Sequence, residues 1–118
     1  MSTLTGRQAE DASVRWLEDR GHRVLARNYR YHRFGEIDIV TRLDDALCFV
    51  EVRARRPGQP VSALESITPG KVTRIRKAAS GYLAALEEEP AAIRLLALVV
   101  DLDAFGRPGG ISCISMDE

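Results

Sequence analysis

The segments "FGEIDIV" (residues 34–40) and "CFVEVRAR" (residues 48–55) decide how this chain is expected to fold. Apolar residues alternate with other residues in both segments, and this period of two is typical of β-strands. The linker between them carries Asp44 and Asp45, a turn-forming pair, so the two segments predict a β-hairpin. The two strand segments are unusual because they carry three carboxylates, Glu36, Asp38 and Glu51, followed closely by Arg53.

A hairpin that is symmetric about Asp44 and Asp45 would place Asp38 opposite Glu51, and Glu36 opposite Arg53. Opposed side chains lie about 5 Å apart at Cβ, and like charges at that distance are destabilising. Two such carboxylates suit a hard divalent cation such as Mg²⁺, which takes oxygen ligands and retains water. The spacing equally fits a solvated face on which Glu36 pairs with Arg53 and Asp38 pairs with another arginine. The residues alone leave both interpretations open.

The rest of the chain extends the hairpin into an α/β domain. Helical periodicity and a capping box from Thr5 to Gln8 predict a helix over about residues 6–20, with an apolar stripe of Ala9, Ala12, Trp16 and Leu17. A strand over residues 22–30 precedes the hairpin. A loop over residues 55–70 follows it, and Thr68 with Pro69 then predicts the start of a second helix. Two more strands, over residues 93–103 and 110–116, complete the order α-β-β-β-α-β-β. The helical crossover between the third and fourth strands requires parallel pairing there. The predicted fold is therefore a single domain with a mixed central β-sheet flanked by helices.

Composition limits the class of protein. A chain of 118 residues is long enough for one domain with a core and too short for two. No apolar run approaches the ~18 residues of a membrane span, and the N-terminus lacks the pattern of a signal peptide. Cys48 and Cys113 lie in strand-like apolar segments, which predicts reduced, buried cysteines and a cytoplasmic location. Formal net charge is zero, so only a localised basic face could bind nucleic acid.

Such a face is available in two segments. Arginines leave the third strand, and basic residues occupy the second predicted helix: Arg53, Arg55, Arg56, Lys71, Arg74, Arg76 and Lys77. Charges on a helix more often solvate the face opposite its apolar stripe, and this alternative stays open. Tyr29 and Tyr31 fit either packing on the sheet or stacking on bases. Trp16 and Tyr82 are expected in the core.

Several ordered motifs resemble the YraN-like family of small bacterial proteins. The resemblance runs from Gly6 to about Leu83 and includes "GRQAEDAS", "RNYR", "GEIDIV", "FVEVRAR" and "ITPGKVTRIRKAASGYL". That family is assigned to the PD-(D/E)XK nuclease-like superfamily. The resemblance therefore implies a restriction-endonuclease-like fold over residues 1–118, with its core at about residues 5–103.

The resemblance also implies roles for individual residues. Asp38 and Glu51 match the carboxylates that bind Mg²⁺ or Mn²⁺, and Glu10 matches a further acidic position on the first helix. Glu36 belongs to the GEID motif and would support the metal ligands. Where the motif has lysine this chain has Arg53, which stays protonated and so cannot act as a general base, although it can grip phosphate. The residues expected to contact nucleic acid are Arg55, Arg56, Lys71 and Arg74.

The expected function is hydrolysis of DNA phosphodiester bonds with Mg²⁺, for example on branched or flapped DNA. Resolvase-like relatives act as homodimers, and the resemblance extends that expectation to this chain. Two alternatives remain open. One is a nucleic-acid-binding module without turnover, and the other is a protein–protein adaptor in which the hairpin charges form a structural ion-pair network.

Overall fold

The hairpin predicted from the sequence is present and has the predicted register near its turn. The computed structural model describes residues 4–58 and 67–117. Strand β2 (Gly35–Leu43) and strand β3 (Ala46–Arg55) are antiparallel and are joined by the two residues Asp44 and Asp45. Asp44 has a left-handed backbone with φ of 52°. The pairs run from Leu43–Ala46 to Ile39–Val50, because a two-residue turn fixes the register of the strands that it joins.

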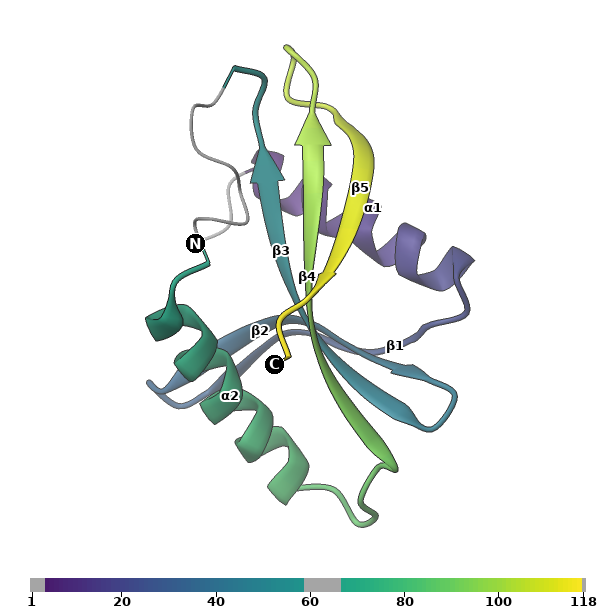
Figure 1. Ribbon diagram of the computed structural model, residues 1–118, viewed down its shortest axis with the longest axis vertical. Helices are drawn as coiled ribbons and strands as arrows, with labels where there is room; N and C mark the ends of the chain where they lie inside the picture. The colour runs from purple at the N-terminus through teal and green to yellow at the C-terminus, as the bar shows by residue number, and fades with distance from the viewer. Residues whose placement is uncertain (1–3, 59–66, 118) are drawn as a thin grey trace.

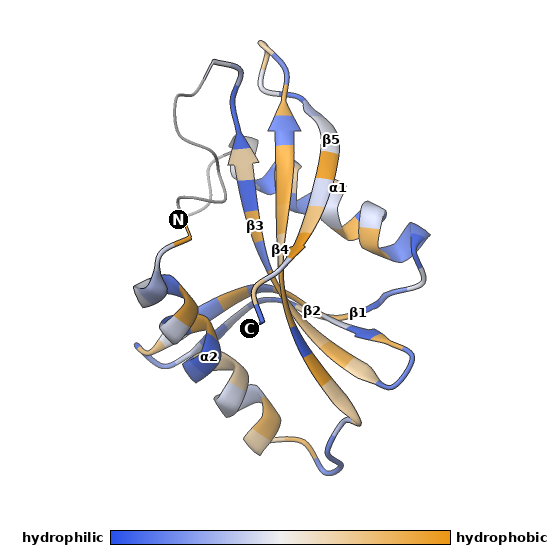
Figure 2. Ribbon diagram, in the orientation of Figure 1, coloured by the Kyte–Doolittle hydropathy of each residue, from blue (hydrophilic) through white to orange (hydrophobic). Residues whose placement is uncertain are grey.

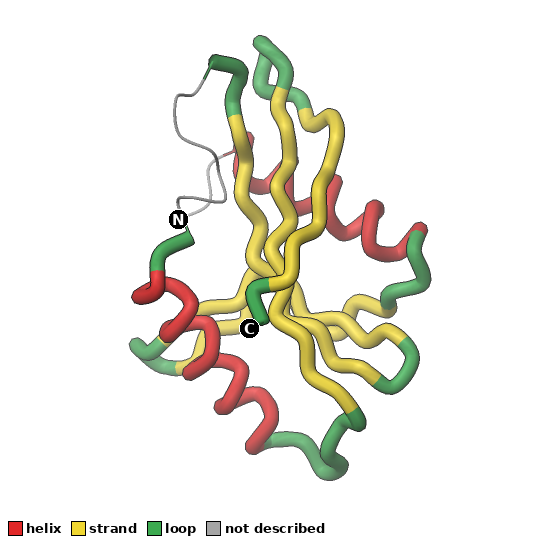
Figure 3. Tube along the Cα trace, in the orientation of Figure 1, coloured by secondary structure: helices red, strands yellow, loops and turns green. Residues whose placement is uncertain are grey.

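Five strands form one mixed sheet in the order β1-β2-β3-β4-β5 (Figures 1 and 3). The remaining strands are β1 (Arg23–Tyr31), β4 (Ala92–Leu102) and β5 (Pro108–Ser115). Strands β3 and β4 are parallel and every other neighbouring pair is antiparallel. The predicted element order and the predicted parallel pair are both confirmed. The single α/β domain with its mixed sheet and two helices is consistent with a restriction-endonuclease-like fold.

Helix α2 (Pro69–Ala84) packs mainly on β1 and β2. Thr68 caps it as predicted, with its hydroxyl oxygen accepting a hydrogen bond from the Lys71 backbone N–H at 3.3 Å. Ile75, Ala78 and Ala79 of α2 are buried in a cluster with Phe49 and neighbouring apolar side chains of the sheet. Leu86 lies beyond the helix end and is exposed. Part of the predicted loop that precedes α2, residues 59–66, lies outside the described residues.

Helix α1 (Leu4–Asp19) crosses the sheet behind β3, β4 and β5 (Figure 1). It begins two residues earlier than the capping box predicted. Its buried side chains are Ala9, Glu10, Ser13 and Leu17. The predicted apolar stripe of α1 was therefore wrong in part, because Trp16 is only half-buried. The Arg20 guanidinium covers its ring, with Cζ 3.7 Å from the ring centroid. Ser13 can be fully buried because its hydroxyl donates to the Ala9 carbonyl oxygen at 2.8 Å.

Strand β4 carries the most continuous hydrophobic stretch in the sheet (Figure 2). Its side chains contribute to clusters on both faces, Leu95 with α2 and Leu98 with α1, as expected of a central strand. Cys48 is buried on β3, but Cys113 is exposed because β5 is an edge strand. The prediction that both cysteines are buried was thus wrong for Cys113. No helix in the described part of the chain is long and apolar enough to cross a membrane.

Candidate active site

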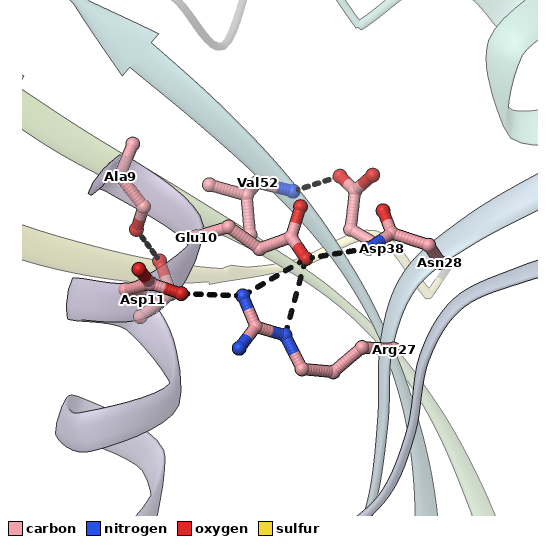
Figure 4. Close-up of polar contacts among 8 residues, drawn as sticks. Ala9, Glu10, Asp11, Arg27, Asn28, Asp38 and Val52 are labelled. Atoms are coloured by element: carbon pink, nitrogen blue, oxygen red, sulfur yellow. Dashed lines mark hydrogen bonds and ion pairs between the residues drawn. The ribbon is translucent and has the colours of Figure 1, made fainter. Parts of the chain in front are cut away.

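The site lies where the two strands of the hairpin separate. Pairing between β2 and β3 ends at Ile39–Val50, and the next carboxylate, Asp38, takes over as partner of the β3 backbone. Asp38 Oδ2 accepts a hydrogen bond from the Val52 backbone N–H at 2.7 Å (Figure 4). This bond satisfies a backbone donor that would otherwise lose its ladder partner, and it also fixes the orientation of the Asp38 carboxylate.

A cleft of about 510 Å³ opens at this fork. Strands β1, β2 and β3 and the first half of α2 all contribute to its walls. The lining residues are Asn28, Arg30, Glu36, Asp38, Glu51, Arg53, Lys71, Arg74 and Ile75. Seven of these nine side chains are charged, so the cleft is built for a polar or ionic ligand.

Asp38 lies close enough to Glu51 for the Glu51 carboxylate to affect the ionisation of Asp38. The pKa of Asp38 is raised to about 7: burial is the largest cause, the Glu51 carboxylate adds to the increase, and the hydrogen bond from the Val52 N–H opposes it. Two carboxylates in one cleft repel each other when both are ionised, and a proton or a cation between them relieves the repulsion. The pair is therefore a site where positive charge is favoured.

Arg53 supplies part of that positive charge. Its Nη2 atom lies 3.2 Å from Glu51 Oε1, and both side chains are largely shielded from solvent, 23% and 15% exposed. Arg53 Nε is buried without a hydrogen-bond partner in the described residues. A buried donor without a partner costs free energy. It can be satisfied by an acceptor that enters the cleft.

Glu10 projects from α1 toward the same region. Its side chain is buried, and its Oε1 atom accepts hydrogen bonds from Arg27 at 3.2 and 3.3 Å and from Asn28 at 3.1 Å (Figure 4). Burial raises the pKa of Glu10, the charge on Asp38 raises it further, and the bonds from Arg27 and Asn28 lower it. Arg27 also pairs with Asp11 at 2.6 Å. Helix α1 thus brings Glu10 within electrostatic range of Asp38, in a position held by strand β1.

The remaining predicted site residues fall into two groups. Lys71 and Arg74 line the cleft, as does Glu36, which pairs with Arg30 at 3.4 Å. Glu36 and Arg53 are therefore not the cross-strand pair that hairpin symmetry predicted, because the β2–β3 ladder has already ended. Arg55 and Arg56 are not among the described residues that line the cleft. Arg55 pairs with Asp101 on the adjacent strand β4 at 2.6 Å.

Three site residues on β1 were not predicted from the sequence: Arg27, Asn28 and Arg30. Asn28 adopts a left-handed conformation with φ of 53°, which asparagine tolerates better than most residues. This local distortion lets the Asn28 amide reach Glu10 while the side chain also lines the cleft. The "RNYR" motif was part of the family resemblance. The roles of its polar side chains nevertheless depend on hydrogen bonds to Glu10 of α1, which the alternating pattern of a strand does not reveal.

No group of three or more His, Cys, Asp and Glu side chains in the described residues is arranged to hold a metal ion. The pair Asp38 and Glu51 nevertheless has the chemistry of a divalent-cation site, because it offers hard oxygen donors and concentrates negative charge. Mg²⁺ is commonly held by one or two carboxylates, with the other positions filled by water and phosphate oxygens. The donor set therefore fits an ion that binds together with a substrate.

Fold and cleft together define a class: a small α/β protein with paired carboxylates and basic side chains at the open end of a hairpin. Within that class the chain belongs to the uncharacterised protein family UPF0102, whose model matches residues 9–102. The matched range contains every residue that lines the cleft. The YraN-like resemblance is thereby confirmed.

Individual relatives agree with this placement. A UPF0102 protein of Prosthecochloris aestuarii is 46% identical over 78 residues, which make up 66% of this chain and 61% of that protein. A UPF0102 protein of Shewanella loihica is 39% identical over 98 residues, 83% of this chain and 84% of that protein. One from Pelotomaculum thermopropionicum is 41% identical over 104 residues, 88% of this chain and 86% of that protein. The match to the Prosthecochloris protein thus spans less than two thirds of that relative's length.

Proposed function

We propose that the cleft hydrolyses phosphodiester bonds of DNA in the cytoplasm, with Mg²⁺ or Mn²⁺ held by Asp38 and Glu51. The observation that carries the proposal is the pairing of these two carboxylates in a cleft whose rim is basic. This combination suits a phosphodiester substrate, because the carboxylates attract a divalent cation and the basic side chains of the rim attract phosphate. It also accords with the nuclease superfamily that the hairpin motifs resemble.

Asp38 and Glu51 would hold the ion on the floor of the cleft. A bound divalent cation supplies Lewis-acid stabilisation of the phosphoryl oxygens and makes water easier to deprotonate. The Val52 N–H fixes one Asp38 oxygen, so the rotation of that carboxylate is already restricted before a ligand arrives. Such preorganisation reduces the entropy lost on binding.

Arg53 contributes charge and not proton transfer. An arginine remains protonated in proteins, so it cannot remove a proton from water. Its buried Nε–H lacks a partner in the described residues and can donate to a phosphate oxygen while Nη2 remains near Glu51. Arg53 therefore stabilises the negative charge that develops on the phosphoryl group.

Lys71 and Arg74 bind the DNA backbone from the opposite wall of the cleft. Both belong to the first two turns of α2, where the helix dipole also favours negative charge. The Lys71 backbone N–H is already bonded to Thr68, so phosphate is attracted by the side chain and the dipole and not by that amide. Arg30 extends the basic wall from β1, although its ion pair with Glu36 offsets part of its charge.

A binding module without turnover is the second candidate, and one observation favours it. The ion pair between Arg53 and Glu51 already neutralises one of the two carboxylates, which weakens the attraction for a cation. Such a module would bind DNA with a steep salt dependence and without any need for metal. A protein–protein adaptor would show neither metal dependence nor DNA affinity.

The test is a cleavage assay on duplex, flapped and branched DNA with Mg²⁺, with Mn²⁺ and with chelator. We expect cleavage by the wild type only with the cations, and none by Asp38→Asn or Glu51→Gln, both of which should retain DNA affinity. Arg53→Ala should slow cleavage by about 10²–10³-fold, the effect of losing one donor to a developing oxyanion, and Arg53→Lys should restore most of it.

Arg42→Ala is the matched control, because Arg42 is an exposed β2 arginine that does not line the cleft. It should cleave as the wild type does. Cleavage that persists in Asp38→Asn, or that proceeds unchanged in chelator, would refute the proposal. DNA binding without cleavage on any substrate would establish the binding module instead.

A further inference from the structure

The turn between β1 and β2 carries an exposed aromatic cluster beside the cleft. We call residues Tyr31, His32, Arg33 and Phe34 the aromatic tip. The Phe34 N–H donates to the Tyr31 carbonyl oxygen at 3.0 Å, which closes the turn. The ring centroids of Tyr31 and Phe34 are 6.0 Å apart, and those of His32 and Phe34 are 6.2 Å apart. Phe34 remains 53% exposed, so its ring presents a free surface.

The tip is held firmly against α2. Gly35 lies so close to the helix that a Cβ atom there would overlap the Arg74 carbonyl group. A Cβ atom at Gly81 would likewise overlap the Tyr31 ring. Two glycines on different elements thus permit close backbone and ring contacts. Figure 1 shows the turn between β1 and β2 beside α2. An exposed phenylalanine on a rigid support can bind a flat ligand with little loss of side-chain entropy.

A continuous basic track joins the tip to the cleft. A notch of about 240 Å³ lies at the tip and is lined by Arg30, His32, Arg33, Gly35, Glu36 and Arg74. Arg30, Glu36 and Arg74 also line the main cleft, so the two hollows are contiguous. At the far end of the track, the Lys77 ammonium lies 6.0 Å from the centroid of the Phe34 ring. Basic side chains therefore line the surface from Asp38 to Phe34.

We propose that Phe34 stacks on an unpaired base of a DNA strand whose backbone follows the track into the cleft. Alternating cations and exposed aromatic rings are how proteins bind single-stranded nucleic acid, since every base offers a face for stacking. A base inside a duplex is already stacked on its neighbours, so the tip selects DNA with a single-stranded segment. This inference rests on the proposed function for the path of the strand, and it narrows the substrate to overhangs, flaps or gaps.

The length of the track sets the position of the stacked base. Phe34 lies in the turn just before β2 and is four residues from Asp38, so the Cα atoms of the two residues are at most about 13 Å apart. That distance is about two to four nucleotides, depending on how far the DNA strand is extended. The stacked base is therefore expected about two to four nucleotides from the phosphate at Asp38.

The test uses duplex DNA with a single-stranded overhang that carries 2-aminopurine at successive positions, in buffer with chelator so that no cleavage occurs. The wild type should quench the fluorescence at one position of the overhang. Phe34→Ala should remove the quenching and weaken binding to overhang DNA by about 5- to 150-fold, with affinity for blunt duplex unchanged. Phe34→Trp should retain both signals.

Phe105→Ala is the matched control. Phe105 is also an exposed phenylalanine, 84% exposed, and like Phe34 it has a cation near its ring, the Arg107 guanidinium at 5.8 Å from the ring centroid, but it lies on the turn between β4 and β5. It should behave as the wild type. Quenching that survives in Phe34→Ala, or equal losses for overhang and blunt DNA, would overturn the inference. So would dimerisation of the wild type that Phe34→Ala abolishes, because the ring would then serve a second copy of the chain.

The two proposals can fail separately. If Phe34-dependent quenching occurs but no substrate is cleaved with Mg²⁺ or Mn²⁺, hydrolysis fails and the stacking site stands. If cleavage depends on Asp38 while quenching and affinity are independent of Phe34, the stacking site fails and hydrolysis stands.

Discussion

The first and second halves of β3 have opposite environments although they form one continuous strand. Residues Ala46–Val50 are all buried and pair with both β2 and β4. Residues Glu51–Arg55 continue to pair with β4 but lose β2, and they include three charged side chains. The charges are tolerated because the ladder opens there, which admits solvent on one side. The strand therefore shows how a single element can form part of the core at one end and line a charged cleft at the other.

The largest effect that separates the two halves is expected from Phe49, which is fully buried in the first half. Its ring packs edge-on against Tyr82 of α2, with centroids 5.8 Å apart. Phe49→Ala should lower the free energy of unfolding by about 3–5 kcal/mol, because it removes apolar contacts and leaves a cavity. Urea denaturation measures the change. A loss no larger than that of a surface substitution would show that the first half is not the rigid core described above.

An intermediate effect, an increase in stability and not a loss, is expected from replacing Asp38, whose carboxylate accepts a hydrogen bond from the second half of β3. The pKa of Asp38 is raised in the folded protein, so the folded state holds a proton that the unfolded state has released, and stability falls as pH rises between about 4 and 7. Asp38→Asn keeps an acceptor for Val52 but has no charge. Its stability relative to the wild type should rise by about 2 kcal/mol between about pH 5 and pH 8.

The same pH comparison can be sharpened with Mg²⁺ under the proposed function. An ion that binds the folded state stabilises it, and the ionised carboxylate binds better than the protonated one. Mg²⁺ should therefore raise the wild-type melting temperature more at about pH 8 than at about pH 5, and should have little effect on Asp38→Asn. A difference between the two proteins that does not change with pH would contradict the raised pKa of Asp38.

The smallest effect is expected at the exposed end of the second half. Arg55 pairs with Asp101, but both side chains are more than two-fifths exposed, at 41% and 44%. Solvent screens an exposed ion pair, so Arg55→Ala should change the free energy of unfolding no more than an ordinary surface substitution does. Urea denaturation at low and high salt provides the measurement. A larger loss, insensitive to salt, would mean that the charged half of β3 is as tightly coupled to the core as the buried half.

Local sequence signals predicted those parts of the fold that depend on neighbouring residues. The turn at Asp44 and Asp45 fixed the hairpin register, and Thr68 with Pro69 fixed the start of α2, because both signals act within a few residues. The buried face of α1 was predicted less well. Ser13 and Glu10 are polar yet buried, since each finds a hydrogen-bond partner that the helical period alone does not reveal.

The site was predictable only to the extent that the hairpin register extends to it. Asp38 and Glu51 meet because they directly follow the last regular pair of the ladder. The partners of Arg55 and Glu36 were not predictable, since they depend on the registers of β4 and β1, which no local signal sets. Asn28 was missed for the same reason, because its hydrogen bond to Glu10 joins two residues that are 18 apart in the chain.

The hydrogen bond from Val52 to Asp38 gives the protein a backbone reporter of its own site. Because the amide proton of Val52 points at a carboxylate that titrates near neutrality, its NMR chemical shift should follow the charge on that carboxylate. Its solvent exchange should slow whenever the carboxylate is held still. The Val52 amide resonance would thus record protonation of Asp38 and, under the proposed function, cation binding in the cleft, without a substrate analogue or an attached probe.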